Sequence, residues 1–313
     1  MLLKLIIQNN KRSFWYIPAF LLLVWISLFV GSCTQQADLP IIVSRKDFKV
    51  TFPYEVDRVG IFINTRWGTS KTIQRLYLDN HSPTWANDSF ISGNGAIRKS
   101  KSYEYRTKTA EGFELNGDVY ICDSISIAEI VFKNVPYYRI ANPQNKVNGV
   151  IGENIISRGI WKIDFKNNII TFASHIDSIE DIKSSNLLKS RFTDQGIEID
   201  AVFRNNVAQT IQLDLGYNLS LIMPSKEFKE ISKGNDKRYT ELLNFSTPSG
   251  SQEVETTQVF DSVLIDRNYF TCIISSNSLV KEALMGRLFL QQFEFMILDY
   301  LNRSVYVSKS RLY

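Results

Sequence analysis

Histidine and cysteine, the residues that most often bind zinc or act as nucleophiles, are scarce in this 313-residue chain. It contains only His81, His175, Cys33, Cys122 and Cys272. Zinc sites built from several such ligands are therefore disfavoured, and we expect no metal. The sequence also has no Gly-rich phosphate loop, Gly-x-Ser-x-Gly elbow or run of metal ligands, which disfavours nucleotide enzymes, serine hydrolases of that type and metalloproteases. Any hydrolytic chemistry must therefore rely on carboxylates or hydroxyls.

Two of the aspartates, Asp79 and Asp214, stand at matching points of a long internal repeat. Each follows a hydrophobic, strand-like run and precedes a turn. They are 135 positions apart, and the same offset separates Asp164 from Asp299. The latter two lie in Asp-aromatic-x-Asn turns and are predicted to be structural. Agreement of several features in order and spacing predicts a duplicated domain.

A glycine forms a second landmark in each copy of the repeat. Two hydrophobic residues precede Gly152, which lies 73 positions after Asp79, and two precede Gly286, which lies 72 positions after Asp214. Close backbone packing is the expected role of both glycines.

Between these landmarks the chain alternates as β-strands do, and long amphipathic helical patterns are scarce. We predict two mainly β lobes, residues 46–173 and 191–313. The polar segment 174–190 lacks a clear strand pattern and is the predicted linker. Cys122 and Cys272 fall in strand-like runs at non-equivalent places of the repeat. Two separately buried thiols are therefore expected, with a disulfide as the alternative.

Composition and charge narrow the possible partners. Apolar residues make up 44% and charged residues 22% of the chain, an ordinary globular mixture. The formal net charge of +4 includes Lys4, Lys11 and Arg12 of a leader with no acid before residue 33, and falls to +1 without them. A general nucleic-acid binder is therefore disfavoured.

The leader, residues 1–32, has the features of an export signal: a basic start, an apolar run at 14–30 and small residues before Cys33. Its Val-Gly-Ser-Cys end resembles the bacterial lipobox. This resemblance implies a cleaved signal peptide and a tether at 33–45. It also implies acyl chains on Cys33 that hold the protein on the periplasmic or outer-surface side of a bacterial membrane. The alternative is an uncleaved transmembrane anchor, because the run is about as long as the lower limit for a span.

The order of the landmarks resembles the clan AA aspartic peptidases, with the two-lobed pepsin architecture and a sequence texture closer to bacterial retropepsin-like proteins. In that family each lobe has a hydrophobic strand, an Asp-Thr/Ser-Gly loop, a flap hairpin and a hydrophobic-hydrophobic-Gly segment that crosses behind the loop. The resemblance covers nearly all of residues 46–313. It places Asp79 and Asp214 at the catalytic positions, and Gly152 and Gly286 at the crossing positions. It implies an all-β fold of two similar acid-protease lobes with a central cleft.

The resemblance also implies a chemistry for Asp79 and Asp214. Two carboxylates held close together cannot both ionise cheaply, so they share a proton and titrate as a unit. The ionised member deprotonates a bound water while the protonated member polarises the scissile carbonyl. Flaps are expected near residues 108–113 and 247–252, and neither a metal nor an organic cofactor is required.

Both aspartate loops depart from the family pattern. Asn80 and His81 replace Thr/Ser and Gly after Asp79. In the second loop Leu215 replaces the hydroxyl residue, and Gly216 is retained. In the family each hydroxyl reaches the opposite lobe; Asn80 can still form a hydrogen bond there, whereas Leu215 cannot. His81 is expected beside the position of the nucleophilic water, so His81→Gly is predicted to raise activity; a loop histidine bonded to its neighbours is the alternative.

The sequence thus predicts an exported, lipid-anchored, aspartic-peptidase-like protein. Its expected partner is a peptide or protein, hydrolysed by water with Asp79 and Asp214. Because both loops depart from Asp-Thr/Ser-Gly, a pseudo-peptidase that binds a peptide or partner protein in the inter-lobe cleft stays open as the rival. A plain structural lipoprotein with a filled cleft is the third interpretation.

Overall fold

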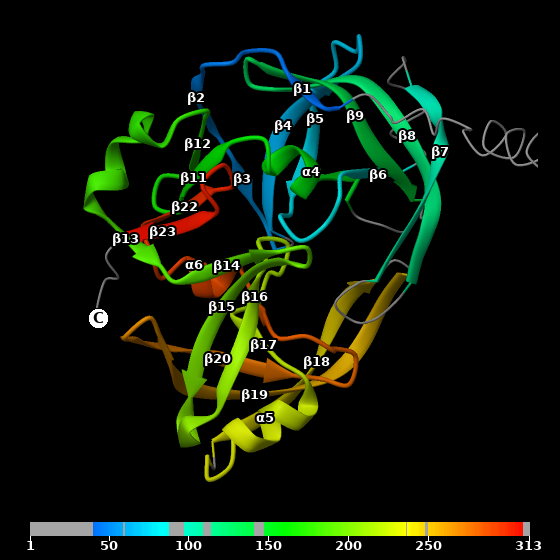
Figure 1. Cartoon of the computed structure of the whole chain (residues 1–313). Coiled ribbons are helices and arrows are strands. Elements are labelled where there is room, and N and C mark those ends of the chain that lie inside the picture. The colour runs from blue at the N-terminus through cyan, green and yellow to red at the C-terminus, as the bar shows by residue number, and fades with distance from the viewer. Residues whose placement is uncertain are drawn as a thin grey trace, which may run out of the picture. The chain divides into compact units, whose positions relative to one another are not determined.

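A computed structural model describes residues 40–58, 60–87, 97–108, 114–140, 147–235, 237–247 and 250–308. These residues belong to one compact unit, Pro40–Tyr313, and form three sheets (Figure 1). The predicted export signal and Cys33 lie outside the described residues. Among the residues that are described, no helix has the length and apolar character needed to cross a bilayer.

The first sheet builds the N-terminal lobe around the strand that leads to Asp79. This strand, β5 (Gln74–Leu78), lies between antiparallel β4 (Ile61–Trp67) and parallel β10 (Gly149–Ile151). The remaining strands of the sheet are β1 (Ile42–Val43), β3 (Glu55–Val56), β6 (Trp85–Asn87), β7 (Ile97–Lys108), β8 (Glu114–Ile127) and β9 (Ile130–Ile140).

The second sheet repeats this arrangement around Asp214. Here β16 (Ala208–Leu213) lies between antiparallel β15 (Gly196–Phe203) and parallel β21 (Leu284–Met285). The remaining strands are β14 (Ser190–Thr193), β17 (Leu221–Ile222), β18 (Arg238–Thr247), β19 (Gly250–Ile265) and β20 (Asn268–Ser276). Because β15 also pairs with β19, as β4 does with β8 in the first lobe, each sheet closes on itself. The prediction of two similar β lobes is confirmed.

The third sheet is shared by the two halves of the repeat. Strand β11 (Ile160–Asp164) pairs antiparallel with β22 (Phe295–Asp299), and Figure 1 shows the red β22 beside the green β11. The sheet continues outward on one side through β12 (Ile169–Ala173) and β2 (Lys49–Pro53), and on the other through β23 (Ser304–Ser308) and β13 (Ser185–Leu188). Equivalent strands therefore meet at the centre of a sheet that joins the lobes.

The Asp-aromatic-x-Asn turns end the two central strands. Asp164 Oδ1 accepts a hydrogen bond from the backbone N–H of Asn167 at 2.9 Å. Asp299 Oδ1 accepts one from the backbone N–H of Asn302, also at 2.9 Å. In both turns the Asn side chain donates to the other carboxylate oxygen. These aspartates stabilise hairpin turns, as the sequence predicted.

The segment 174–190 is more structured than its sequence indicated. Two 3-10 turns, Ile176–Ser178 and Glu180–Ser184, are followed by β13, which pairs with β23. The predicted linker therefore contains a strand that its sequence pattern does not reveal. The period-2 pattern is missing because β13 is an edge strand of which only Leu188 is buried.

Large aromatic side chains fill the main hydrophobic core, which includes residues of both lobes and the shared sheet. The rings of Trp161 and Phe172 stack with centroids 4.4 Å apart, and Trp67 contacts Tyr137 edge to face at 5.2 Å. The α-helices of the described residues are short: α4 (Glu153–Ile156), α5 (Ser225–Ile231) and α6 (Arg287–Leu290). Cys122 and Cys272 are buried free thiols, which confirms the prediction for both.

Candidate active site

Asp79 and Asp214 occupy equivalent positions at the buried ends of β5 and β16. The last three residues of each strand are buried, so the strand carries the following aspartate toward the interior. The Asp79 backbone N–H donates to the carbonyl of Ile151 at 3.1 Å, and the Asp214 N–H donates to the carbonyl of Met285 at 2.9 Å. The strand that crosses behind each loop therefore fixes the start of that loop.

Gly152 and Gly286 allow these crossings because no side chain fits at either position. A Cβ on Gly152 would lie 2.1 Å from the Ser82 carbonyl oxygen. A Cβ on Gly286 would lie 2.4 Å from the Tyr217 carbonyl oxygen. Both contacts are with backbone atoms that cannot rotate away, so the glycines serve close packing behind the aspartate loops, as predicted.

The two aspartate loops meet each other directly. A Cβ added to Gly216 would lie 2.3 Å from Asp79 Cγ, so the Gly216 backbone packs against the Asp79 carboxyl group. Gly216 is two residues beyond Asp214, whose side chain is buried and close enough to influence the titration of Asp79. The structure thus brings together the two aspartates that the sequence paired.

The environment of Asp79 favours its protonated form. Burial and the negative charge of Asp214 raise the pKa of Asp79 to about 7. Hydrogen bonds from the backbone N–H groups of His81 and Ser82 act against this increase. The His81 N–H donates to Asp79 Oδ1 at 2.8 Å and so fixes one carboxyl oxygen. The pair can therefore retain a shared proton from acid to about neutral pH.

Asn80 makes a hydrogen-bonded contact with the opposite lobe. Its Nδ2 donates to the carbonyl of Leu213 at 2.9 Å, and its Oδ1 accepts from the Leu215 N–H at 2.7 Å. Asn80 is fully buried. The expectation that Asn80 can still bond to the opposite lobe is confirmed. Leu215 is buried in the hydrophobic core and has no polar side-chain group to return the contact, so the link is one-sided.

His81 lies at the edge of this contact. A Cβ on Gly196 of β15 would lie 2.9 Å from His81 Nδ1. Within the described part of the chain, this buried nitrogen has no hydrogen-bond partner. Burial raises the pKa of the half-buried Glu153, and the nearby His81 acts against this increase. One edge of the ring therefore contacts the C-terminal lobe.

No protein-family model and no curated protein matches the sequence. Among solved structures, the aspartic proteinase from Irpex lacteus matches with a TM-score of 0.57 and 14% sequence identity. The match covers 84% of this chain and 98% of that one. The chain has the two-lobed fold of a pepsin-like aspartic proteinase. At this identity the likeness shows the fold alone.

In this pepsin-like fold, hairpins occupy the places where flaps were expected. Strands β7 and β8 pair as far as Lys108 and Glu114, and β18 and β19 pair as far as Thr247 and Gly250. The hairpin tips at 109–113 and 248–249 lie outside the described residues.

Tyr77 is a site residue that the sequence pattern did not reveal. Its hydroxyl donates to the Gly216 carbonyl at 2.5 Å, which joins the lobes beside the aspartates. Burial, with the charges of Asp79 and Asp214, raises the pKa of Tyr77 well above its ordinary value, so the hydroxyl stays a donor. The available signal was strand periodicity, because a residue two positions before Asp79 lies on the same face of β5.

Arg287 is a second residue that was missed. It follows the crossing glycine of the C-terminal lobe and is only 6% exposed. Its Nε donates to Asn218 Oδ1 at 2.9 Å. Burial lowers the pKa of Arg287, while nearby tyrosines and Asp57 act in the opposite direction. No local pattern distinguishes this buried arginine from a surface one.

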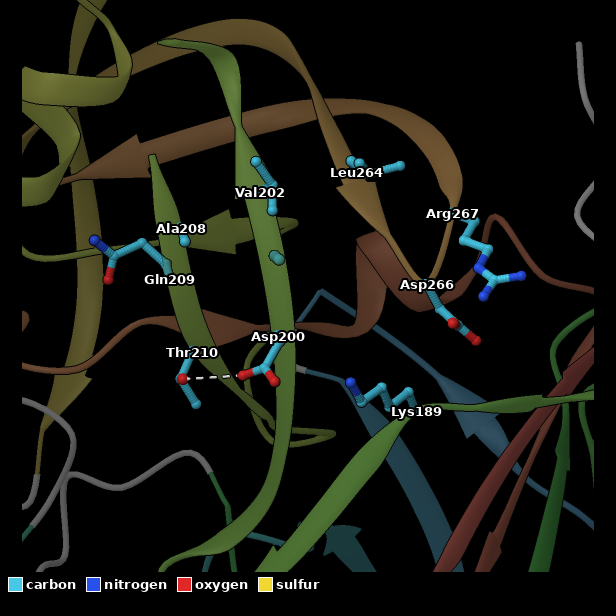
Figure 2. A pocket seen from close by; sticks show the side chains of 10 residues that line it. Lys189, Asp200, Val202, Ala208, Gln209, Thr210, Leu264, Asp266 and Arg267 are labelled. Atoms are coloured by element: carbon cyan, nitrogen blue, oxygen red, sulfur yellow. Dashed lines mark hydrogen bonds between the residues drawn. The ribbon is translucent and has the colours of Figure 1, made fainter. Parts of the chain in front are cut away.

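A surface groove of about 730 Å³ lies away from the aspartates, on the C-terminal lobe (Figure 2). Its polar lining includes Asp200, which accepts a hydrogen bond from Thr210 at 3.2 Å. The full lining is Lys189, Asp200, Ala201, Val202, Ala208, Gln209, Thr210, Leu264, Asp266 and Arg267. None of these residues belongs to the aspartate loops. Within the described ranges, no group of three or more His, Cys, Asp or Glu side chains gathers to hold a metal ion.

The cross-lobe contact of Asn80 gives a testable expectation for stability. Asn80→Ala leaves a buried carbonyl and a buried N–H unpaired, and we expect a loss of about 2–4 kcal/mol in the free energy of unfolding. Asn80→Thr supplies a hydroxyl that can donate and accept, so it should restore most of this loss. Urea unfolding of the three proteins measures both effects. Asn186→Ala, at an exposed position of β13, is the matched control. An equal loss in the Thr and Ala variants would contradict the assigned contact.

Proposed function

We propose that this chain is an aspartic peptidase in which Asp79 and Asp214 activate a water molecule against a peptide bond. The observation that supports it best is the meeting of the two aspartate loops, in which the Gly216 backbone packs against the Asp79 carboxyl group, with the pKa of Asp79 raised by burial and by Asp214. Such a pair holds one proton where two separate surface aspartates would hold none.

The reaction needs only this shared proton and a water. The ionised carboxylate takes a proton from water as the hydroxide adds to the scissile carbonyl carbon, and the protonated carboxyl donates its proton to the carbonyl oxygen. The C–N bond then breaks as the first carboxyl passes its proton to the leaving nitrogen. The hydroxyl proton of the intermediate returns to the second carboxylate, which restores the starting state. Because the pair titrates as a unit, neither role belongs permanently to one residue.

The rival proposal is a pseudo-peptidase that binds a peptide or protein between the lobes. Leu215 favours it, because this side chain cannot make the second cross-lobe contact that the family uses. The retained bond from the His81 N–H to Asp79 and the two bonds of Asn80 favour an active pair.

Cleavage of a broad peptide library by Pro40–Tyr313 tests the proposal. The reaction should be followed from pH 3 to pH 8, with and without a transition-state-analogue inhibitor of aspartic peptidases. We expect inhibitor-sensitive cleavage that declines as the pair loses its shared proton above about neutral pH. Peptide binding without cleavage at any pH would replace the enzyme proposal with the pseudo-peptidase.

We also propose that the protein is exported and anchored to a bacterial membrane through lipid on Cys33. Cys33→Ser should abolish metabolic labelling with a fatty acid, because the thiol is the acylated group. Cys272→Ser is the control, since this buried thiol belongs to β20 and should leave labelling intact. Label that persists in Cys33→Ser would refute the lipid anchor.

A further inference from the structure

The repeat relates Tyr77 to Gln212 and His81 to Gly216. Each pair is separated by 135 positions, the offset of the two aspartates. Tyr77 and Gln212 are both buried, two residues before an aspartate. Tyr77 and Gln212 therefore occupy equivalent buried positions in the two lobes.

On one side, a large strand residue meets a small loop residue. The Tyr77 hydroxyl bonds to the Gly216 carbonyl, as described above. Gly60 leaves room for this ring, because a Cβ there would lie 2.3 Å from Tyr77 Cε2. Tyr77 thus spans the gap between the lobes on this side.

At the second pair of positions the side-chain sizes are exchanged. The strand residue, Gln212, is smaller than Tyr77, and the loop residue, His81, is larger than Gly216. Gly196 leaves the room here: a Cβ on Gly196 would lie 2.9 Å from His81 Nδ1 and 3.3 Å from Gln212 Oε1. Both polar atoms are buried without a partner among the described residues. Both lie close to the same point beside Gly196 without bonding to each other directly, so one water between them can join them.

We propose that His81 is a positioning residue that holds the Asp79 loop to Gln212 of the C-terminal lobe, in place of the hydroxyl contact that Leu215 cannot make. The imidazole Nδ1–H donates to a bridging water, and that water donates to Gln212 Oε1. Gln212 is held from its other end, because its Nε2 donates to Glu198 Oε1 at 3.4 Å. His81 thereby joins the lobes from a loop on one side of the aspartates, as Tyr77 joins them from a strand on the other side.

This contact acts on Asp79 through the backbone. The His81 N–H donates to Asp79 Oδ1 at 2.8 Å, so anchoring the His81 side chain also fixes the amide that orients the carboxyl group. Small displacements of such a group reduce the rate without changing substrate binding to the same extent. This consequence for catalysis rests on the proposed peptidase function, whereas the contact itself does not. His81→Gly is then expected to lower activity, the opposite of what the family resemblance implied.

A double-mutant cycle on unfolding tests the contact without any need for activity. His81→Phe leaves Gln212 Oε1 buried and unpaired, and Gln212→Leu does the same to His81 Nδ1. Each variant of Pro40–Tyr313 should lower the urea midpoint. The double variant should fall no further than the worse single one, because with an apolar pair neither the His81 nitrogen nor the Gln212 oxygen is left buried and unsatisfied. Additive losses would overturn the proposed contact.

Peptide cleavage by the same proteins tests the positioning role. His81→Phe and His81→Gly should lower kcat by about tenfold with KM changed less than about twofold. His81→Asn places an amide nitrogen near the Nδ1 position and should retain kcat within about threefold. An increase of kcat in His81→Gly would overturn the proposal. If the wild-type protein cleaves nothing, the peptidase function fails while the unfolding cycle still decides the contact.

Discussion

Asp79→Asn and Asp214→Asn should each lower kcat for peptide cleavage by about 10²–10⁴-fold. Either change removes a group that can carry the shared proton, because an amide neither takes a proton from water nor supplies one to a carbonyl oxygen. Asparagine has nearly the shape of aspartate and its Oδ1 can still accept the His81 N–H, so the fold should persist. The measurement is kcat and KM on one cleaved peptide from the library, with circular dichroism to verify folding.

The turn aspartates provide matched controls for this experiment. Asp164 and Asp299 have the same 135-residue offset, and their carboxylates accept hydrogen bonds within hairpin turns. Asp164→Asn and Asp299→Asn keep an acceptor oxygen and lie outside the aspartate loops, so both should retain most cleavage activity. Full activity in Asp79→Asn or Asp214→Asn would remove the shared-proton mechanism, whatever happens in the controls.

The duplicated β architecture was predictable because it depends on features that repeat along the chain. A hydrophobic strand before each aspartate and a glycine some 70 positions later define the same crossing in both lobes. The contact at Asn80 was also predictable in kind, since an amide both donates and accepts. Its partners, the Leu213 carbonyl and the Leu215 N–H, follow only from the meeting of the two loops.

The position of the His81 ring could not be predicted from local sequence. Its neighbour Gly196 is 115 positions away, at the start of a strand with no special motif. The family resemblance implies only that His81 stands where a glycine is usual, because the resemblance concerns one loop at a time. The signal in the sequence is an exchange of side-chain size between the two copies of the repeat. Position 77 is larger than its counterpart 212, and position 81 is larger than its counterpart 216. This exchange can be interpreted only when the structure places the two lobes side by side.

The two lobes contribute unequally to the polar contacts between the aspartate loops. The N-terminal loop supplies the polar side chain of Asn80. The C-terminal lobe supplies the Leu213 carbonyl and the Leu215 N–H, while the Leu215 side chain is apolar. Most of the polar contact between the loops therefore depends on side chains of the first lobe. Variants in residues 80 and 81 should disturb both aspartates, because the two loops hold each other.

Asp79→Asn should also make the protein more stable at neutral pH, although it should remove the proposed activity. The folded-state pKa of Asp79 is raised from 3.8 to about 7, so between these values the folded protein binds more protons than the unfolded chain. The free energy of unfolding therefore falls as pH rises through this window, and the full cost is present above pH 7. Removing the ionisable group should increase the free energy of unfolding by about 1–3 kcal/mol at pH 7.5 and by almost nothing at pH 3.5.

Urea unfolding of the wild type and Asp79→Asn at these two pH values measures the difference. A gain of equal size at both pH values would indicate a packing effect instead of a titration effect. A loss at pH 7.5 would contradict the burial of Asp79 beside Asp214. This result does not depend on catalysis, so it separates two questions that cleavage assays combine: whether the carboxylates are paired, and whether the paired carboxylates cut peptides. A pH-dependent gain in the free energy of unfolding without measurable cleavage would show that the carboxylates are paired but do not cut peptides.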